Sequence, residues 1–130
     1  MNNISDLHDY SLASWVLQPD SWQMIFDSEN AKETIELKIT GLEKWRLSNI
    51  GSPCIILDLQ SFVIDKHMLD NRYARESWRR LLSFYCSDDD IVRLSQDLIK
   101  EHSGEIIITF ETPSSEFIDL ICKNYQMIRI

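Results

Sequence analysis

Three aspartates stand side by side at positions 88–90, directly ahead of a run with helical periodicity. Such a group suits calcium binding, contact with a positively charged partner, or the start of a helix. A calcium loop needs a glycine at its sixth position and a glutamate at its twelfth, and DDDIVRLSQDLI has neither. Unpaired amides at a helix N-terminus favour carboxylates by about 0.3–1 kcal/mol each. We therefore expect Asp88, Asp89 and Asp90 to start a helix, one of them as N-cap, which leaves them available to a partner.

Other residue types that do chemistry do not form a known pattern. The pair His8–Asp9 resembles part of the metal site of phosphohydrolases, but only His67 and His102 remain as further histidine ligands, and their spacing does not match. The chain has no Gly-x-Ser-x-Gly nucleophile motif, and its three scattered glycines cannot build a phosphate-binding loop. The chain therefore shows no strong catalytic signature, and we predict that it holds neither a metal nor a cofactor.

Basic residues gather in one part of an otherwise acidic chain. The net charge is −8, yet residues 68–86 carry four arginines against two acidic side chains. Arg72, Arg75, Arg79 and Arg80 suit either contact with an acidic partner or ion pairs within the protein, and we favour the second interpretation. The overall charge argues against binding to nucleic acid or to anionic membranes. The four tryptophans are expected to pack in the core.

Length and composition indicate one globular domain spanning residues 1–130. Hydrophobic residues make up 44% of the chain, which contains only three glycines and three prolines. The start has no signal-peptide pattern, and no apolar run approaches the roughly 18 residues that span a bilayer. Cys54, Cys86 and Cys122 are an odd set without Cys-x-x-Cys spacing, typical of reduced thiols. We expect a cytoplasmic protein.

Hydrophobic periodicity predicts strands in the first half of the chain and helices after it. Strands are expected at 11–17, 22–27, 34–40 and 54–59, and a bent strand or bulge follows Gly41 and leads into EKWRL. A four-turn helix is expected from Asp70 as N-cap, with its apolar side formed by Tyr73, Ala74, Ser77, Trp78, Leu81, Phe84 and Tyr85. A second helix should bury Ile91, Leu94, Leu98 and Ile99 and end at Gly104.

The end of the chain is ambiguous. A strand is predicted at 105–111, and the following EFIDLICKNYQMIRI fits either a helix or a strand. Because this run is rich in β-branched residues and follows a turn, we favour a terminal hairpin. The complete prediction is an α+β domain: one antiparallel sheet of about five or six strands, with one or two helices on one face.

The segments LHDYSLASWVLQPDSWQMIFDS, TIELKITGLEKWRLSNI and PCIILDL, together with the run IDLICKN near the end, resemble a group of small bacterial immunity proteins. These proteins belong to polymorphic toxin systems, including contact-dependent growth inhibition. The similarity covers about the first 60 and the last 25 residues and is a pattern of strand starts. The resemblance implies a protein that is not an enzyme and that binds and neutralises a cognate toxin domain in the cytoplasm.

Acidic side chains are the contacts that we expect for such a partner. A cationic toxin domain, as in many nucleases, would associate faster with an acidic protein. We predict contact through Asp88, Asp89, Asp90, Glu111 and Glu116, with any exposed Trp or Tyr as anchors. Two alternatives stay open: a chaperone or adaptor that binds a peptide segment of a secreted effector in an apolar groove, and a small enzyme with an unrecognised site.

Overall fold

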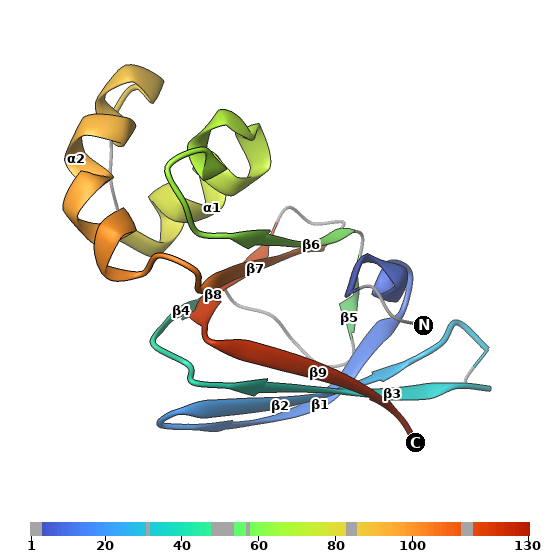
Figure 1. Cartoon of the computed structure of the whole chain (residues 1–130). Helices are drawn as coiled ribbons and strands as arrows, with labels where there is room; N and C mark the ends of the chain where they lie inside the picture. The colour runs from blue at the N-terminus through green and yellow to red at the C-terminus, as the bar shows by residue number, and fades with distance from the viewer. Residues whose placement is uncertain (1–3, 31, 48–53, 57, 83–85, 113–115) are drawn as a thin grey trace.

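The computed structural model describes residues 4–30, 32–47, 54–56, 58–82, 86–112 and 116–130. Figure 1 labels β1 (Ser11–Gln18), β2 (Ser21–Asp27), β3 (Thr34–Thr40), β4 (Lys44–Leu47), β5 (Cys54–Ile55), β6 (Asp58–Val63), α1 (Arg72–Leu82), α2 (Asp88–Glu101), β7 (Ile106–Glu111), β8 (Phe117–Cys122) and β9 (Asn124–Arg129). Short 3-10 turns at Ile4–Leu7 and Met68–Asp70 precede β1 and α1. None of the described helices is long and apolar enough to cross a membrane.

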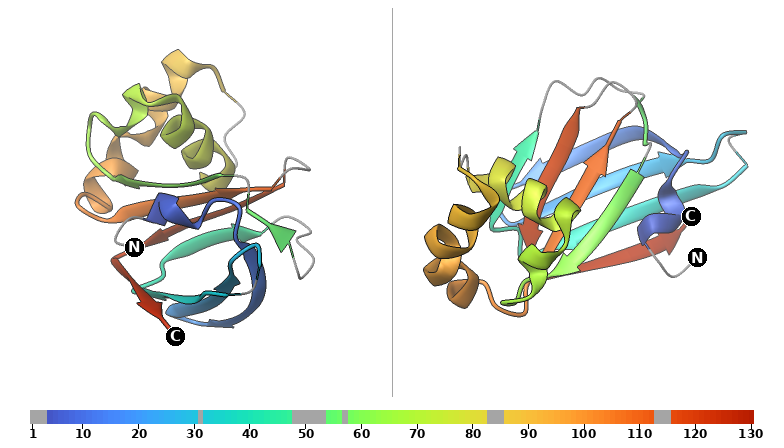
Figure 2. Two further views of the ribbon diagram at one scale, coloured as in Figure 1. Left: turned by 90° about the vertical axis from the view of Figure 1, so that its right-hand side faces the viewer. Right: turned by 90° about the horizontal axis from the view of Figure 1, so that it is seen from above.

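The strands form two antiparallel sheets that face each other, and both helices lie on one outer side (Figure 1). The first sheet has five strands in the order β5-β1-β2-β3-β9, and the second has four in the order β4-β8-β7-β6. Figure 2 shows α1 and α2 above the second sheet, so that this sheet is the middle of three layers. The outer face of the first sheet carries no helix.

Two hydrophobic cores hold the three layers together. The core between the sheets contains Trp22, Met24 and Phe26 of β2, and Phe26 stacks on Phe110 with ring centroids 6.1 Å apart. The second core joins the four-stranded sheet to the helices through Trp78, Leu81, Ile107 and Ile121, among others. Because β7 and β8 are covered on both faces, they are apolar at nearly every position.

The predicted α+β class is confirmed, but the prediction of one sheet of about five or six strands is wrong. The chain passes from one sheet to the other four times: between β3 and β4, between β4 and β5, between β5 and β6, and between β8 and β9. Gly41, with φ of +62°, lies at the first of these crossings, where a bend within one sheet was expected. Alternation of side chains tells which face of a strand is buried, but not which sheet contains it.

The end of the chain is extended, as favoured, and β8 pairs antiparallel with the preceding strand β7, but the run does not stay in one sheet. β8 pairs with β4 and β7, whereas β9 pairs with β3 in the other sheet. Lys123 separates the two strands, and its amide donates hydrogen bonds to the carbonyls of Thr40 and Gly41. The chain therefore makes two crossings at one corner of the sandwich, one in each direction.

The N-caps of both helices differ from those predicted. Asn71, not Asp70, caps α1, since its Oδ1 accepts hydrogen bonds from the amides of Tyr73 (2.9 Å) and Ala74 (3.3 Å). Ser87 caps α2 by accepting from the amide of Asp90, so that all three aspartates lie in the first turn. The positions predicted for Phe84 and Tyr85 lie outside the described residues.

Helix orientation also departs from the prediction in two places. Ala74, Ser77, Trp78 and Leu81 are buried as expected, but Tyr73 is 51% exposed. In α2, Ser95 is buried with Ile91 and Ile99, whereas Leu94 is 46% exposed. The indole Nε1 of Trp78 donates a hydrogen bond to Ser95 Oγ at 2.6 Å, and this contact accounts for the burial of a serine in place of a leucine.

Two of the three cysteines can be placed. Cys86 and Cys122 are free thiols, the first half-buried and the second fully buried. Burial raises the pKa of the Cys122 thiol to about 12. The side chain of Cys54 lies outside the described residues.

Candidate binding site

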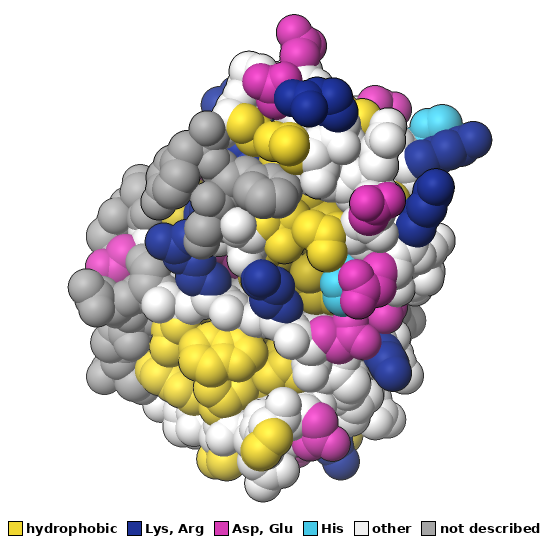
Figure 3. Space-filling model, turned by 90° about the vertical axis from the view of Figure 1, so that its left-hand side faces the viewer, with side chains coloured by type: hydrophobic (Ala, Val, Ile, Leu, Met, Phe, Trp, Pro, Cys, Tyr) yellow, Lys and Arg dark blue, Asp and Glu magenta, His cyan; other side chains and the backbone are white. Residues whose placement is uncertain are grey.

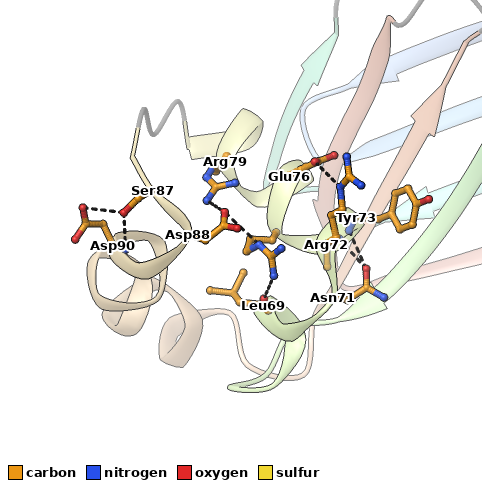
Figure 4. Close-up of polar contacts among 11 residues, drawn as sticks. Leu69, Asn71, Arg72, Tyr73, Glu76, Arg79, Ser87, Asp88 and Asp90 are labelled. Atoms are coloured by element: carbon orange, nitrogen blue, oxygen red, sulfur yellow. Dashed lines mark hydrogen bonds and ion pairs between the residues drawn. The ribbon is translucent and has the colours of Figure 1, made fainter.

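The first of the three aspartates is bound within the protein. Asp88 Oδ1 accepts a hydrogen bond from Nη2 of Arg79, and Arg75 Nε lies 3.4 Å from the same oxygen (Figure 4). Arg75 also donates through Nη1 to the carbonyl of Leu69 at 2.9 Å. The hydrogen bond from Arg79 is the largest cause of the lowered pKa of Asp88. These contacts join α2 to α1. They agree with the expectation that the arginines form ion pairs within the protein.

The next two aspartates are less constrained. Asp90 accepts hydrogen bonds from Arg93 at 3.2 Å and from Ser87 Oγ at 3.1 Å, and the contact with Arg93 is the larger cause of its lowered pKa. Asp89 is exposed, and its carboxylate has no partner among the described residues. Contacts with α1 therefore occupy Asp88, local contacts at the helix start occupy Asp90, and Asp89 alone of the three has no partner among the described residues.

Arg80 forms the most buried charged contact in the described residues. Its Nε donates to Asp119 Oδ2 at 2.7 Å, and its Nη2 donates to Oδ1 at 2.9 Å. Asp119 is 1% exposed and also accepts hydrogen bonds from Ser77 Oγ (2.7 Å) and Thr109 Oγ1 (2.8 Å). Arg80 also lies 3.7 Å from the ring centroid of Phe117. This network attaches α1 to the middle sheet.

A cavity of about 270 Å³ opens beside this network, between α1 and the strands β6, β7 and β8. Its lining is Asp58, Gln60, Arg72, Tyr73, Glu76, Arg80, Thr109, Glu111 and Phe117. Tyr73 and Phe117 supply aromatic surface, and Tyr73 is half exposed. The remaining side chains are polar or charged, so the cavity suits a polar ligand group.

The charge balance of this cavity is negative. Arg80 is neutralised by Asp119 beneath it, and Arg72 Nε donates to Glu76 Oε1 at 3.2 Å. Among the described residues, Asp58 accepts hydrogen bonds from two uncharged donors, the amide of Leu59 and the side chain of Gln60. The Glu111 carboxylate has no partner among the described residues. Two carboxylates are therefore left without a neutralising cation.

The structure places the predicted contact residues on two sides of α1. Asp88 lies against Arg75 and Arg79, whereas Glu111 lines the cavity on the side of Arg72 and Glu76, and Figure 4 shows these two sides of the helix. Glu116 lies just before β8, where its amide donates to Thr112 Oγ1 at 3.3 Å. Glu111 pairs with Phe117, the residue after Glu116, so these two acidic residues are close. The aspartates and the glutamates do not form one surface.

A second group of ionisable side chains lies at the opposite end of the middle sheet. His102 Nδ1 is 2.8 Å from Glu43 Oε2 and 3.1 Å from Glu105 Oε2. Burial acts to lower the pKa of His102, but the contacts with Glu105 and Glu43 outweigh it and raise the pKa. Burial, followed by contact with Glu43, raises the pKa of Glu105, whereas contact with Glu105 is the largest cause of the lowered pKa of Glu43.

One tryptophan departs from the expectation that all four pack in the core. Trp22 and Trp78 are fully buried and Trp15 is half-buried, but Trp45 is 45% exposed. Trp45 lies on β4, an edge strand, and contacts Trp22 edge to face with centroids 5.9 Å apart. The face shown in Figure 3, on the side of β4, carries a hydrophobic patch beside basic side chains.

Comparisons with models of known protein families, with curated proteins and with solved structures find no match to this chain. The function must therefore be inferred from the sites themselves.

Sequence reasoning singled out Glu111, Arg72 and Arg80, but it did not place them in one cavity and it missed Asp58. Asp58 and Asp119 each interrupt a strongly apolar strand, and that signal indicates a carboxylate with a buried or structured role. The group at His102 had a weaker signal. Glu105 follows His102 by three residues, but Glu43 is 59 residues away in the sequence. Only the folded chain brings Glu43 next to His102.

Proposed function

We propose that this protein binds a basic protein domain and neutralises it stoichiometrically, as the immunity proteins that it resembles do. The observation that carries the proposal is the cavity beside α1, where Asp58, Glu76 and Glu111 line one space. Two of these carboxylates lack a neutralising cation. A lysine or arginine of a partner that enters the cavity would supply the missing charge, and a net charge of −8 would speed its approach.

The surroundings of the cavity fit a contact between proteins. Tyr73 is half exposed at its margin, and tyrosine is among the residues that most often dominate binding energy. Phe117 supplies a second aromatic surface, against which an aliphatic side-chain stem packs well. A bound basic side chain would thus meet carboxylates at its charged end and aromatic rings along its stem.

The proposal is tested by calorimetric titration of the whole chain with the C-terminal domain of the polypeptide encoded immediately upstream of its gene. The expected result is tight one-to-one binding that weakens as salt rises, because exposed charges are screened within about 10 Å at 0.1 M ionic strength. The domain should also lose its toxic activity when it is mixed with this protein. Absence of binding, or binding that salt does not change, would contradict the proposal.

A second candidate function is an adaptor that binds an extended peptide, and strand β4 favours it. This strand pairs only with β8 among the described residues, and it presents the half-exposed Trp45. A peptide can add to such an edge through backbone hydrogen bonds. Substitution of Trp45 by alanine would weaken a peptide adaptor strongly but would leave binding at the acidic cavity unchanged. The two functions are therefore distinguishable with one variant.

A further inference from the structure

The group formed by Glu43, His102 and Glu105 lies where three segments meet. Glu43 follows the crossing from the first sheet to the second, and its amide donates to the carbonyl of Ile121 at 2.9 Å. His102 ends α2, where its amide donates to the carbonyl of Leu98 at 3.0 Å. Glu105 precedes β7, and its amide donates to the carbonyl of His102, also at 3.0 Å. Each side chain thus starts from a backbone position that is fixed by a hydrogen bond.

The side chains converge on a single atom. Both carboxylates approach Nδ1 of His102, at 2.8 and 3.1 Å, and one ligand atom from each residue lies within 4.8 Å of the other two. A single N–H at Nδ1 cannot donate a well-aligned hydrogen bond to two carboxylates at once. The side chains of His102 and Glu105 are each 17% exposed and that of Glu43 is 27% exposed, so the three groups meet at a partly buried point. One carboxylate is left there without a well-aligned donor from His102.

Contrary to the expectation from the sequence that the chain holds no metal, we propose that Glu43, His102 and Glu105 bind a divalent transition-metal ion of the zinc type. Imidazole nitrogen and carboxylate oxygen are both ligands of zinc, and three protein ligands with a water molecule complete a tetrahedral site. Bonds of about 2.0–2.1 Å to a tetrahedral ion place neighbouring ligand atoms about 3.3 Å apart. The present separations of 2.8 and 3.1 Å differ from this value by only a few tenths of an ångström. Small side-chain shifts would admit the ion in place of the Nδ1 proton.

The other described histidines provide matched controls. His8 lies 3.6 Å from Asp9, and His67 lies 3.8 Å from Asp70. Each of these pairs offers two ligands, not three, and all four side chains are at least 62% exposed. They have the same residue types as the proposed site without its convergence. An ion that binds any surface histidine beside a carboxylate would bind these two pairs as well as the proposed site.

The test is a titration of the full chain with Zn²⁺ by calorimetry and with Co²⁺ by visible absorption. The proposal predicts one saturable site, with the absorption bands of tetrahedral Co²⁺. His102→Gln and Glu43→Gln should each weaken binding at least about tenfold, in line with the known effect of changes at metal sites. His67→Gln and Cys86→Ser should bind as the wild type does.

Two results would overturn the proposal. One is the absence of saturable binding to the wild type. The other is equal binding by the wild type and by both the His102→Gln and Glu43→Gln variants. Circular dichroism of each variant establishes that it is folded, and the use of two separate ligand variants keeps the test valid if one fails to fold. Because the site does not involve the acidic cavity, this outcome is independent of the proposed function.

Discussion

The indole nitrogen of Trp78 and the hydroxyl oxygen of Ser95 are joined by a buried hydrogen bond of 2.6 Å, which connects α1 to α2. Ser95→Ala would leave a buried N–H without an acceptor, which costs about 1–3 kcal/mol. We expect this loss in the free energy of unfolding, measured with urea. Ser103→Ala, at an exposed position, should change the stability by no more than about 0.5 kcal/mol. Equal stability of the two variants would contradict this role of Ser95.

The contact between Arg80 and Asp119 should matter more for stability. Asp119→Ala removes the acceptor of two hydrogen bonds from Arg80 and leaves its guanidinium, which is 25% exposed, without a carboxylate partner. Removal of one member of a buried ion pair costs about 3–5 kcal/mol, and we expect a loss near the lower limit because Arg80 is partly exposed. Urea unfolding measures it. Arg93→Ala, which breaks an exposed ion pair, should have a much smaller effect.

Asp88 should keep its charge at a pH where an ordinary aspartate is protonated. Its pKa is lowered chiefly by the hydrogen bond from Arg79. Because this pKa is lower in the folded state than in the unfolded state, the contact contributes its full stabilisation at pH values above the unfolded-state pKa of the aspartate. The contribution is lost as the pH falls through the lowered, folded-state pKa. Carboxyl-carbon NMR titration should show a higher pKa for Asp88 in Arg79→Gln than in the wild type. An unchanged pKa would show that Arg79 is not the cause.

Two glycines with positive φ should respond differently to substitution by alanine. A Cβ at Gly104 (φ +86°) would meet no atom within 4 Å, so Gly104→Ala should cost only the roughly 1–2 kcal/mol of the left-handed conformation. A Cβ at Gly41 (φ +62°) would lie 2.6 Å from Cβ of Lys123, at the corner where the chain crosses twice. Gly41→Ala should therefore be the less stable variant in thermal unfolding. The reverse order would contradict this account of the corner.

The sequence predicted elements better than it predicted their assembly. The alternation in TIELKIT predicted a strand at 34–40, and β3 has these bounds. The same alternation cannot report that β8 and β9 belong to different sheets, because pairing partners are distant in sequence. The orientation of α2 was predicted from apolar residues alone, and the prediction was wrong at Leu94, which is exposed. Such a prediction does not consider that the buried indole of Trp78 needs a hydrogen-bond acceptor, which Ser95 supplies.

For the candidate sites too, local features could be predicted from the sequence, whereas contacts between distant segments could not. The charge and local sequence of Asp88, Asp89 and Asp90 predicted a helix start correctly, since capping depends on neighbouring residues. Their relation to Glu111 depended on the position of α1, which local sequence does not determine. The cavity joins residues from β6, α1, β7 and β8, and the proposed metal site joins Glu43 to a helix end 59 residues away.

The acidic cavity beside α1 is the central claim, and comparison of two charge reversals in the same calorimetric titration tests it most directly. Glu111→Lys places a cation in the cavity, whereas Asp89→Lys makes the same change in the first turn of α2, outside the cavity lining, at an exposed carboxylate without a partner among the described residues. We predict that Glu111→Lys weakens binding of the upstream-encoded domain at least tenfold, about 1.4 kcal/mol, and that Asp89→Lys changes it far less. Equal effects, or a larger effect of Asp89→Lys, would contradict the account.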